Sequence, residues 1–526
     1  MESFDYVVVG AGSAGSVLAA RLSEDLGVSV VLLEAGGTDG GTAVSVPAAF
    51  PKLFGTARDW SYETEAQAGL GGRRLRWPRG RMLGGCSSMN AQMYVRGQRA
   101  DYDSWSAQGA TGWGFDDVLP WFERAERAQS IEHLRDPNPL TDAFVAAAQQ
   151  VGIRAVDING ERVEGVSTSP VTQRHGRRWS AADAYLRPAR SRRNLTVRTH
   201  VHVRRVLLEG RRAVGVQTLN ADGSTRTIRA TREVVLAAGA LNSPQLLQLS
   251  GIGDPAHLAA AEVPLVHELP HVGHHLRDHL VSLVVRLTDV PVSLASAQRP
   301  VHLLRYLASR RGPLTSNVAE ALALVRTDPT APAPDIELIF APVPFLDHGA
   351  TPPPGHGYTV GVVLLKPASS GSVRITVPDA RTAPAIGPGY LSDSDGTDLR
   401  VLTRGLQLAQ RVLDADAFTP YAARPHRPDH AFQDDDSLAD FVRSQAETLY
   451  HPVGTCRISP SAATGVVDSR LRVHGLDGLR VADASVMPDL IRGHTHAPTV
   501  MIAERAAAFL AEERTTGVGL TLAQSR

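Results

Sequence analysis

The first part of the chain places apolar and glycine-rich stretches in the order of a strand, a turn, a helix and a second strand. Residues 6–9 form a continuous apolar run, typical of a buried parallel strand, and a glycine-rich turn follows it. Apolar side chains then recur at helical spacing over residues 16–26, and residues 28–33 form a second apolar run. This pattern predicts a βαβ unit at the N-terminus.

The turn of this unit reads Gly10-Ala11-Gly12-Ser13-Ala14-Gly15, and Glu34-Ala35 follow the second strand. In such a turn Gly10 permits the tight bend, Gly12 lets the backbone approach a pyrophosphate, and Gly15 lets the helix pack closely on the strand. The helix N-terminus then faces the phosphates, and the Glu34 carboxylate suits a ribose hydroxyl. The unit predicts a dinucleotide site but does not decide between NAD and FAD.

The rest of the chain predicts a second, antiparallel part. Apolar alternation over residues 194–217 predicts a strand meander, and residues 233–236 predict another buried strand. From about residue 290 to 455 short alternating strands are separated by Pro/Gly loops, with strands expected at 335–342, 358–365 and 372–376 and a helix at 398–415. Residues 73–90 show no long periodic element and are expected to form a loop along a cofactor.

Composition narrows the function classes. A chain of 526 residues is expected to form two domains, and its formal net charge of zero gives no footprint for nucleic acid. Two cysteines in so long a chain indicate a reducing compartment, and residues 1–5 lack the features of a signal peptide. No apolar run reaches the roughly 18 residues of a membrane span. We therefore expect a cytoplasmic protein with a small-molecule partner.

Three histidines near the C-terminus are the candidates for chemistry. His451 lies in Tyr450-His451-Pro452, while His494 and His496 directly precede a helix expected to begin at Pro498. Oxidation of an alcohol needs a base for the hydroxyl proton and a second polar group for the developing alkoxide. Imidazoles suit both tasks. Spacing alone does not distinguish His451 and His494 from histidines with a purely structural role.

Four blocks resemble the glucose-methanol-choline (GMC) oxidoreductase family, in particular its choline-dehydrogenase-like bacterial members. They cover nearly the whole chain: residues 10–15, residues 80–90, residues 239–253 and residues 451–498. The third block, Gly239-Ala240-Leu241-Asn242-Ser243-Pro244-Gln245-Leu246-Leu247, is long and specific. The resemblance implies a mixed α/β fold. Its Rossmann-like FAD-binding domain would comprise residues 1–140, 193–290 and 455–526, with a substrate domain built on an antiparallel sheet from 141–192 and 291–454.

By this resemblance the cofactor is FAD, His451 is the catalytic base, His494 is its partner, and His496 lies nearer the flavin rim. Hydride would pass from the carbinol carbon to flavin N5, and no metal is needed. The residues expected along the cofactor, in addition to the N-terminal unit with Gly10, Gly12, Ser13, Ala14, Gly15, Glu34 and Ala35, are Arg81, Gly84, Gly85, Ser87, Asn90, Met93, Val203, Ala238, Gly239, Asp483 and Ala484.

One departure from the family pattern concerns how the flavin is held. Some family members attach the flavin covalently through a histidine directly before the asparagine of the second block, where this chain has Met89. We therefore expect non-covalent FAD. His274, His275 and His279 are expected to lie in a loop near the domain junction and not to bind a metal. Cys86 is expected to be a small packed residue.

Several alternatives stay open at this point. Tyr450 and Phe345 suit either a substrate pocket or the core. A hydroxynitrile-lyase-type reaction without net redox chemistry is possible on the same scaffold, and an NAD-dependent dehydrogenase would use the same N-terminal unit. The electron acceptor, dioxygen or another carrier, and the identity of the alcohol are not set by the sequence. A choline substrate would need a carboxylate or aromatic cage around its ammonium group, and the sequence does not single one out among Glu320, Glu337, Asp347 and other acids.

Overall fold

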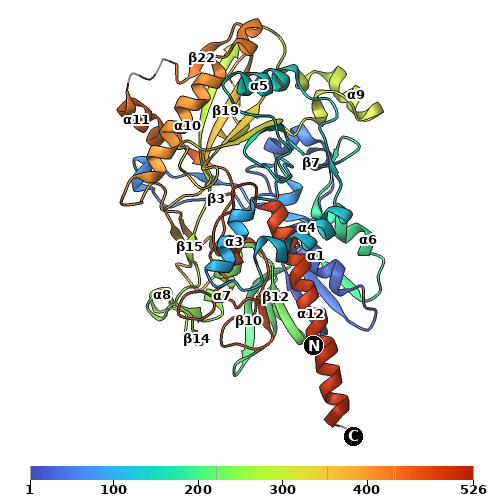
Figure 1. The fold of residues 1–526 in the computed structure, drawn as a ribbon. Coiled ribbons are helices and arrows are strands. Elements are labelled where there is room, and N and C mark those ends of the chain that lie inside the picture. Colours follow the sequence, from blue (N-terminus) through green and yellow to red (C-terminus); the bar gives the residue numbers. More distant parts are fainter. Residues whose placement is uncertain (1, 221, 352, 430–431, 433, 525–526) are drawn as a thin grey trace.

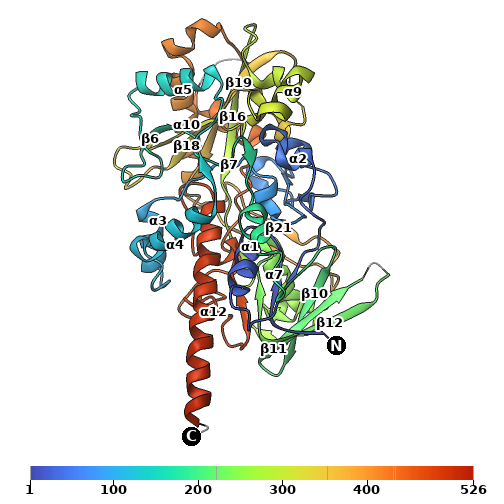
Figure 2. The ribbon, with the colours of Figure 1, turned by 90° about the vertical axis from the view of Figure 1, so that its right-hand side faces the viewer.

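Two large sheets lie at opposite ends of the molecule (Figure 1). The computed structural model describes all residues except 1, 221, 352, 430–431, 433 and 525–526, with the backbone alone for 515–524. The N-terminal strand belongs to the lower sheet, and the C-terminal helix runs beside that sheet and extends below the body (Figures 1 and 2). In the described residues no helix has both the length and the apolar character needed to cross a membrane.

The lower sheet contains the predicted βαβ unit. Its central strands pair in parallel, as crossover connections such as the helix between β1 and β2 require. Its strand order is β10-β11-β12-β1-β2-β9, and β24 also pairs with β12. The strands are β1 (Glu2–Val9), β2 (Val30–Leu33), β9 (Leu195–Arg198), β10 (His202–Glu209), β11 (Arg212–Leu219), β12 (Thr225–Leu236) and β24 (Leu479–Val481).

The predicted meander over residues 194–217 is wrong in its first strand. β9 joins the sheet in parallel beside β2, at the opposite edge from the hairpin of β10 and β11. Apolar periodicity identifies a strand but carries no information about the strand with which it pairs. The mixed α/β fold itself is as predicted.

Helix α1 (Ser13–Leu22) begins at the glycine turn, three residues earlier than predicted, and packs against α12 (His496–Gln524). The buried Glu504 carboxylate of α12 accepts hydrogen bonds from Arg21 of α1 at 2.8 Å and from the Tyr185 hydroxyl at 2.8 Å. Paired and hydrogen-bonded buried charges of this kind are expensive to break. They fix the C-terminal helix against the N-terminal unit.

The upper sheet is antiparallel, as predicted for the second part of the chain. Its order is β22-β16-β19-β18-β17-β6, and β23 also pairs with β16. The strands are β6 (Gly165–Thr168), β16 (Leu280–Thr288), β17 (Ala321–Val325), β18 (Ile336–Ala341), β19 (His356–Leu364), β22 (Arg424–Arg427) and β23 (Glu447–Thr448). Helices α5 (Pro139–Gln150) and α10 (Thr397–Leu413) lie over one face, where Figure 2 draws them at the upper end.

Alternation along β18 divides its side chains between two environments. Ile336, Leu338 and Phe340 pack in the core under the helices, while Ile339 and Ala341 turn to the other face, where they line a cavity. One face of the upper sheet therefore packs in the hydrophobic core, and the other face forms one wall of the cavity.

The structure places two strands in other sheets than the sequence led us to expect. β16 was placed in the FAD-binding part (193–290) but belongs to the upper sheet, because a run buried on both faces has the same appearance in either sheet. The predicted strand at 372–376 is β20 (Gly371–Arg374), which pairs with β15 (His274–Leu276) and β21 (Ala385–Gly387) in a separate small sheet. That the two parts fold as separate domains stays a prediction.

The remaining helices and short strands lie around the two large sheets and between them. The helices are α2 (Thr42–Ser45), α3 (Arg99–Ala107), α4 (Phe115–Ala128), α6 (Arg187–Ala189), α7 (Gly239–Leu249), α8 (Pro255–Ala260), α9 (Pro300–Ser309) and α11 (Asp435–Gln445). The short strands are β3 (Tyr62–Glu63), β4 (Arg76–Trp77), β5 (Ile131–Glu132), β7 (Val171–Arg174), β8 (Arg177–Arg178), β13 (Ile252–Gly253) and β14 (His267–Glu268).

Candidate active site

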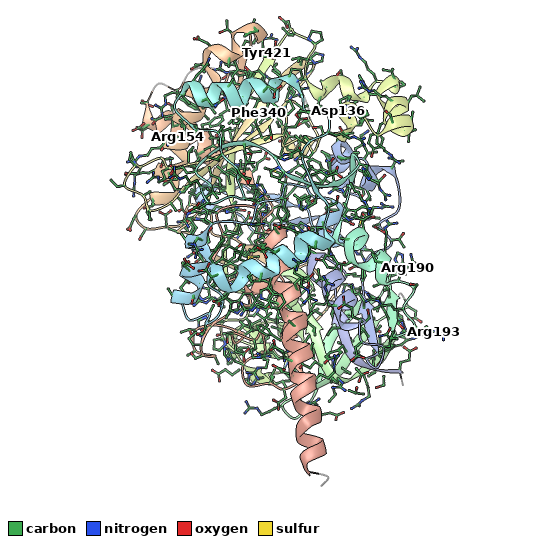
Figure 3. The ribbon with its side chains drawn as sticks, turned by 45° about the vertical axis from the view of Figure 1, so that its right-hand side comes forward. Asp136, Arg154, Arg190, Arg193, Phe340 and Tyr421 are labelled. Carbon is green, nitrogen blue, oxygen red and sulfur yellow. The ribbon has the colours of Figure 1, made fainter. Side chains whose placement is uncertain are left out.

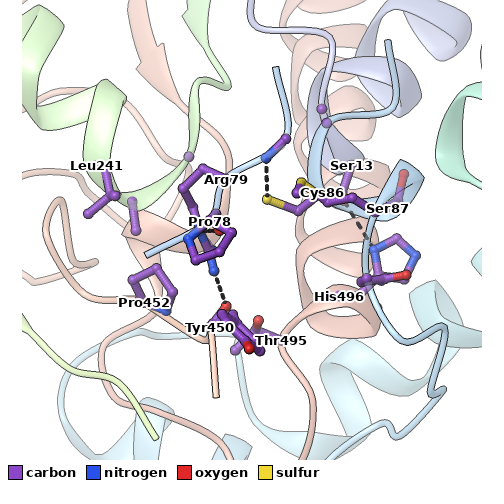
Figure 4. A pocket seen from close by; sticks show the side chains of 18 of the residues that line it. Ser13, Pro78, Arg79, Cys86, Ser87, Leu241, Tyr450, Pro452, Thr495 and His496 are labelled. Atoms are coloured by element: carbon purple, nitrogen blue, oxygen red, sulfur yellow. Dashed lines mark hydrogen bonds between the residues drawn. The ribbon is translucent and has the colours of Figure 1, made fainter. Parts of the chain in front are cut away.

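A single cavity joins the N-terminal glycine turn to the C-terminal histidines. It has a volume of about 340 Å³ and lies between the lower sheet and the cavity-facing side of the upper sheet, so its size is ordinary for a ligand pocket, which usually holds about 300–1,000 Å³. Figure 4 shows Ser13, Cys86, Ser87 and His496 gathered at one side of it, and Tyr450 with Arg79 and Pro452 at another. The glycine turn and the C-terminal histidines therefore line one continuous cavity.

The Glu34 carboxylate stands at the dinucleotide end of this cavity. Its two oxygens accept hydrogen bonds from the backbone N–H groups of Ala11 at 2.9 Å and Gly36 at 2.8 Å, and the side chain is buried. Burial raises its pKa to about 7, against the opposing effect of these two donors. Each oxygen keeps a further lone pair that can accept from a ligand hydroxyl, and the ribose contact itself stays a prediction.

The three glycines of the turn differ in what surrounds them. A Cβ on Gly15 would lie 1.7 Å from the Gly10 carbonyl oxygen, and one on Gly10 would lie 2.6 Å from the Ala237 carbonyl oxygen. On Gly12, by contrast, a Cβ would meet only the Cα of Gly85, at 4.0 Å, and Gly12 lines the cavity. The protein's own packing does not require a glycine at position 12. Its bare backbone leaves room for a ligand, which fits a pyrophosphate.

Most of the predicted cofactor residues share the cavity wall. Three predicted residues do not line the cavity. Gly15 packs under the turn, and the Gly84 N–H donates to the Ala11 carbonyl at 2.7 Å. The Arg81 guanidinium lies over the Trp60 ring, 4.8 Å from its centroid. The predicted residues on the wall are Gly10, Gly12, Ser13, Ala14, Glu34, Ala35, Gly85, Ser87, Asn90, Met93, Val203, Ala238, Gly239, Asp483, Ala484 and His496, together with His451 and His494.

The loop of residues 87–90 is held by a buried arginine. Arg178 donates to the Ser87 carbonyl at 3.1 Å and to the Asn90 side-chain oxygen at 2.9 Å. Its burial lowers its pKa to about 9. Asp483 has a similar structural task, since its carboxylate accepts from the Gly239 N–H at 2.8 Å and from the Ser243 hydroxyl at 2.5 Å. These contacts fix the backbone on two sides of the cavity.

His451 pairs with His279. Their Nδ1 atoms lie 2.9 Å apart, and the Nε2 of His279 lies 3.1 Å from the Leu365 carbonyl oxygen. A carbonyl only accepts, so the His279 Nε2 carries the proton and its Nδ1 is the acceptor in a neutral ring. His451 must then donate through Nδ1–H. Its Nε2 is left as an unprotonated lone pair on a side chain that lines the cavity.

Both rings of this pair are neutral near pH 7. Burial lowers the pKa of His279 to about 3, and it holds the pKa of His451 well below its usual range, with smaller contributions from His494, His279 and Arg79. The backbone N–H of His451 donates to the Asp278 carboxylate at 2.6 Å. The adjacent residues Asp278 and His279 therefore hold the backbone and the ring of His451, respectively.

His494 meets the His451 ring edge to face, with centroids 4.9 Å apart and planes at 86°. Its Nε2 lies 2.9 Å from Oε1 of Glu337, a fully buried carboxylate on β18. This bond fixes Nε2 as a donor and leaves Nδ1 as the free ring nitrogen. His451 and His494 thus lie against each other, and each is oriented by a residue on the upper sheet or next to it; their catalytic roles stay a prediction.

His496 occupies the first position of α12 and not the loop before it. The helix begins two residues before the predicted start at Pro498, so its N-terminus opens on the cavity through Thr495 and His496. The Nδ1 of His496 lies 3.1 Å from the Ser13 hydroxyl oxygen, drawn as a dashed line in Figure 4. Burial lowers the pKa of His496 to about 4.

Two functional residues were missed from the sequence. His279 was expected in a loop near the domain junction, and Glu337 was considered only as one of several acids for a cationic substrate. Their partners lie 172 and 157 residues away in the chain. The one local signal was the acid–histidine pair Asp278-His279 directly before the apolar run of β16.

The wall beyond the histidines is mostly apolar. Phe345 and Tyr450, left open between pocket and core, both line the cavity, and so does Cys86. Phe50 lies 5.8 Å from Phe54 and 6.4 Å from Phe345 between ring centroids, and Phe54 lies 5.8 Å from Tyr450. Upper-sheet side chains complete this wall: Val281, Leu283, Ile339, Ala341 and Thr359.

A glycine-lined βαβ unit lies at one end of the shared cavity, and an oriented, neutral histidine lies at the other; this combination is typical of a dinucleotide-dependent oxidoreductase. The family model described as GMC oxidoreductase matches residues 4–281 and 367–503. The chain belongs to the GMC oxidoreductase family, as its sequence blocks predicted.

Several related proteins align with almost the whole chain. An uncharacterized GMC-type oxidoreductase of Mycobacterium tuberculosis is 47% identical over 521 residues, covering 96% of this chain and 98% of its own. An alcohol dehydrogenase [acceptor] of Pseudomonas putida and the mitochondrial choline dehydrogenase of Homo sapiens are each 40% identical, covering 96% of this chain and 95% and 89% of theirs.

Solved structures agree with this assignment. The pyridoxine 4-oxidase from Mesorbium loti superposes with a TM-score of 0.86 at 34% identity, covering 96% of this chain and 98% of its own. The protein is thus an FAD-dependent oxidoreductase that acts on alcohols, and the predicted FAD cofactor is confirmed at the level of the family.

Proposed function

We propose that the enzyme oxidises an alcohol to an aldehyde or ketone with His451 as the base. The observation that carries the proposal is the His279–His451 pair, which leaves the Nε2 lone pair of His451 free on the cavity wall. That lone pair takes the hydroxyl proton as the carbinol carbon loses a hydride. FAD, when bound, supplies the hydride acceptor at its N5 atom.

His494 is proposed to hold the oxygen from which the proton departs. Glu337 fixes its ring through Nε2 and places it against the His451 ring. When His494 is the cation of an ion pair with Glu337, its Nδ1–H is a second donor, already oriented toward the developing negative charge, so no reorganisation is needed during the reaction. In this proposal His451 takes the proton and His494 binds the substrate oxygen, and a different residue orients each of the two rings.

The chain's own residues suit FAD along the cavity. Glu34 is proposed to bind the adenosine ribose, and the backbone at Gly12 and Ser13 the pyrophosphate. The loop containing Asn90 would lie along the isoalloxazine, and the N-terminus of α12 would favour negative charge on it.

We propose that the flavin is held without a covalent bond, since Met89 offers no nucleophile where some family members carry a histidine. Acid precipitation should release all yellow colour into the supernatant. A yellow pellet that survives washing would contradict the proposal.

An uncharged alcohol suits the wall better than a cationic one. Of the acids considered for a cationic substrate, Glu320 is hydrogen-bonded to Ser316 and Thr141, and Glu337 to His494. Among the described residues Glu447 is the one acid on the wall away from Glu34 and Asp483, and burial raises its pKa while Arg427 opposes that shift. We therefore propose an alcohol with an apolar substituent. Choline and its neutral isostere 3,3-dimethylbutan-1-ol test this directly, and faster flavin reduction by choline would contradict it.

The experiment that tests the proposed function is anaerobic flavin reduction by a panel of alcohols. Bleaching of the visible flavin band is expected with the wild-type enzyme. His451→Ala should remain yellow but reduce about 10²–10⁴-fold more slowly, and His133→Ala, at an exposed position, should behave as wild type. Reduction by His451→Ala at a near-normal rate would remove His451 as the base. Product without bleaching would indicate a lyase instead.

The electron acceptor is distinguished by a second measurement. Hydrogen peroxide formed in air in proportion to product identifies dioxygen. Turnover that requires an added dye or quinone identifies another carrier.

A further inference from the structure

Helix α9 turns its apolar side chains toward solvent. Leu304 and Val301 are 67% and 61% exposed, and Leu307 and Leu303 are 54% and 45% exposed. The described part of the chain exposes eight large apolar side chains, and these four are half of them, all within one ten-residue helix. Single exposed apolar residues are ordinary, whereas a cluster on one element marks a contact surface.

The orientation of α9 is fixed by its other face. Tyr306 is fully buried, and its hydroxyl donates to the Ser45 carbonyl at 3.3 Å. Leu303, Leu304 and Leu307 are three and four positions apart, so they form one stripe. We call these three residues and Val301 the α9 stripe. It faces away from the protein while the helix itself is anchored.

Positive charge surrounds the α9 stripe. No acidic residue occurs between Asp289 and Glu320, whereas arginine occupies positions 299, 305, 310 and 311. Arg299 and Arg305 are exposed. Arg311 pairs at 2.9 Å with Asp136, which Figure 3 labels beside α9. An apolar stripe flanked by arginine is typical of helices that lie in the interface of an anionic membrane.

We propose that α9 docks the enzyme on the surface of an anionic lipid bilayer. The leucines would enter the boundary of the acyl chains, and Arg299 and Arg305 would meet head-group phosphates. A second copy of the chain fits less well. The α9 stripe consists of four side chains, whereas each partner in a stable protein interface contributes about 20–30 residues. A symmetric α9–α9 contact would also bring the same arginines together.

Docking through α9 places the cavity beside the bilayer. η6 (Pro313–Thr315) follows α9 in the chain and packs on η1 (Pro47–Leu53). Phe50 of η1 lines the cavity, as does Val318 shortly after η6. The docked face is therefore separated from the apolar wall by these two short helices.

The test is co-sedimentation of the FAD-loaded enzyme with vesicles. Vesicles of equal parts phosphatidylglycerol and phosphatidylcholine should bind the wild type, and vesicles of phosphatidylcholine alone should bind it more weakly. The variant Leu303→Gln/Leu304→Gln/Leu307→Gln should bind anionic vesicles at least about tenfold more weakly. Arg299→Gln/Arg305→Gln should lose the preference for anionic lipid.

The matched control is Leu26→Gln, which removes the most exposed apolar side chain, at 78%, from a site far from α9 in the chain. It should bind as wild type. All variants should keep the flavin spectrum, because the substituted side chains face solvent. Equal binding by the triple variant and the wild type, or no binding by either, would overturn the proposal. A wild-type dimer in light scattering that the triple variant converts to a monomer would assign the α9 stripe to a second copy and overturn it as well.

Discussion

The Nδ1 atoms of His279 and His451 lie 2.9 Å apart, and this contact sets which nitrogen of His451 is basic. Leu365 fixes the proton of His279 on Nε2, so the tautomer of His451 follows from a backbone carbonyl outside the cavity wall. In the proposed function, His451 is therefore oriented as the base before substrate arrives.

Removal of His279 should impair catalysis through this tautomer. His279→Ala is expected to slow flavin reduction about 10- to 100-fold without loss of FAD, because the Nδ1–H of His451 loses its acceptor. His279→Gln should restore part of the rate, since its amide oxygen accepts from Nδ1–H. Rapid-mixing measurements of reduction at several pH values check this. Equal rates for the two variants would mean that His279 only fills space.

Glu337→Gln should lower the rate of flavin reduction about tenfold and leave KM nearly unchanged, because the carboxylate that orients His494 acts on developing charge. Glu320→Gln is the matched control: Glu320 is also fully buried, but it bonds to Ser316 and Thr141 and contacts neither histidine. It should change the melting temperature and not the rate. A rate loss shared by both variants would point to general disruption of the sheet.

Gly12→Ala and Gly15→Ala should fail in different ways. An alanine at position 15 would place its Cβ 1.7 Å from a backbone oxygen, so little folded protein is expected. An alanine at position 12 meets no protein atom closer than 4.0 Å, so a folded but colourless protein is expected. Circular dichroism and flavin content separate the outcomes. Normal flavin content in Gly12→Ala would move the pyrophosphate away from this turn.

The stability of the holoenzyme should fall as the pH drops below about 6.5. His279, His348, His275 and His496 have pKa values lowered to about 3, 4, 4 and 4, so the folded protein excludes protons that the unfolded chain binds. Their stabilising contribution is complete above pH 6.5 and declines between pH 6.5 and about 4. The three well-buried groups His279, His348 and His496 each contribute about 1.4 kcal/mol of destabilisation by pH 5.5, and the half-buried His275 contributes less because solvent screens its charge.

Thermal unfolding midpoints at pH 7.5, 6.5 and 5.5 measure this decline. His275→Gln, whose ring contacts His271 away from the cavity wall, should make the decline less steep. His133→Gln, at an exposed position, should not. A midpoint that does not change between pH 7.5 and 5.5 would contradict the neutral buried histidines.

The sequence predicted what depends on neighbouring residues. The strand, glycine turn and helix at residues 6–26 form because each local pattern agrees with the next, and Glu34 lies where that unit places it. β9 was misassigned because strand pairing is a long-range property. His279 and Glu337 escaped notice for the same reason, since only the folded sheets bring them to His451 and His494.

The position of β16 has a consequence for protein engineering. Asp278 and His279, which hold the base, directly precede this strand, whereas Val281 and Leu283 on the strand form part of the apolar wall. The residues proposed to support the base and the residues proposed to select the substrate are thus neighbours in sequence but different side chains. Libraries that vary Val281, Leu283, Ile339 and Phe345 can therefore explore new alcohols while the histidine pair and its supports stay intact.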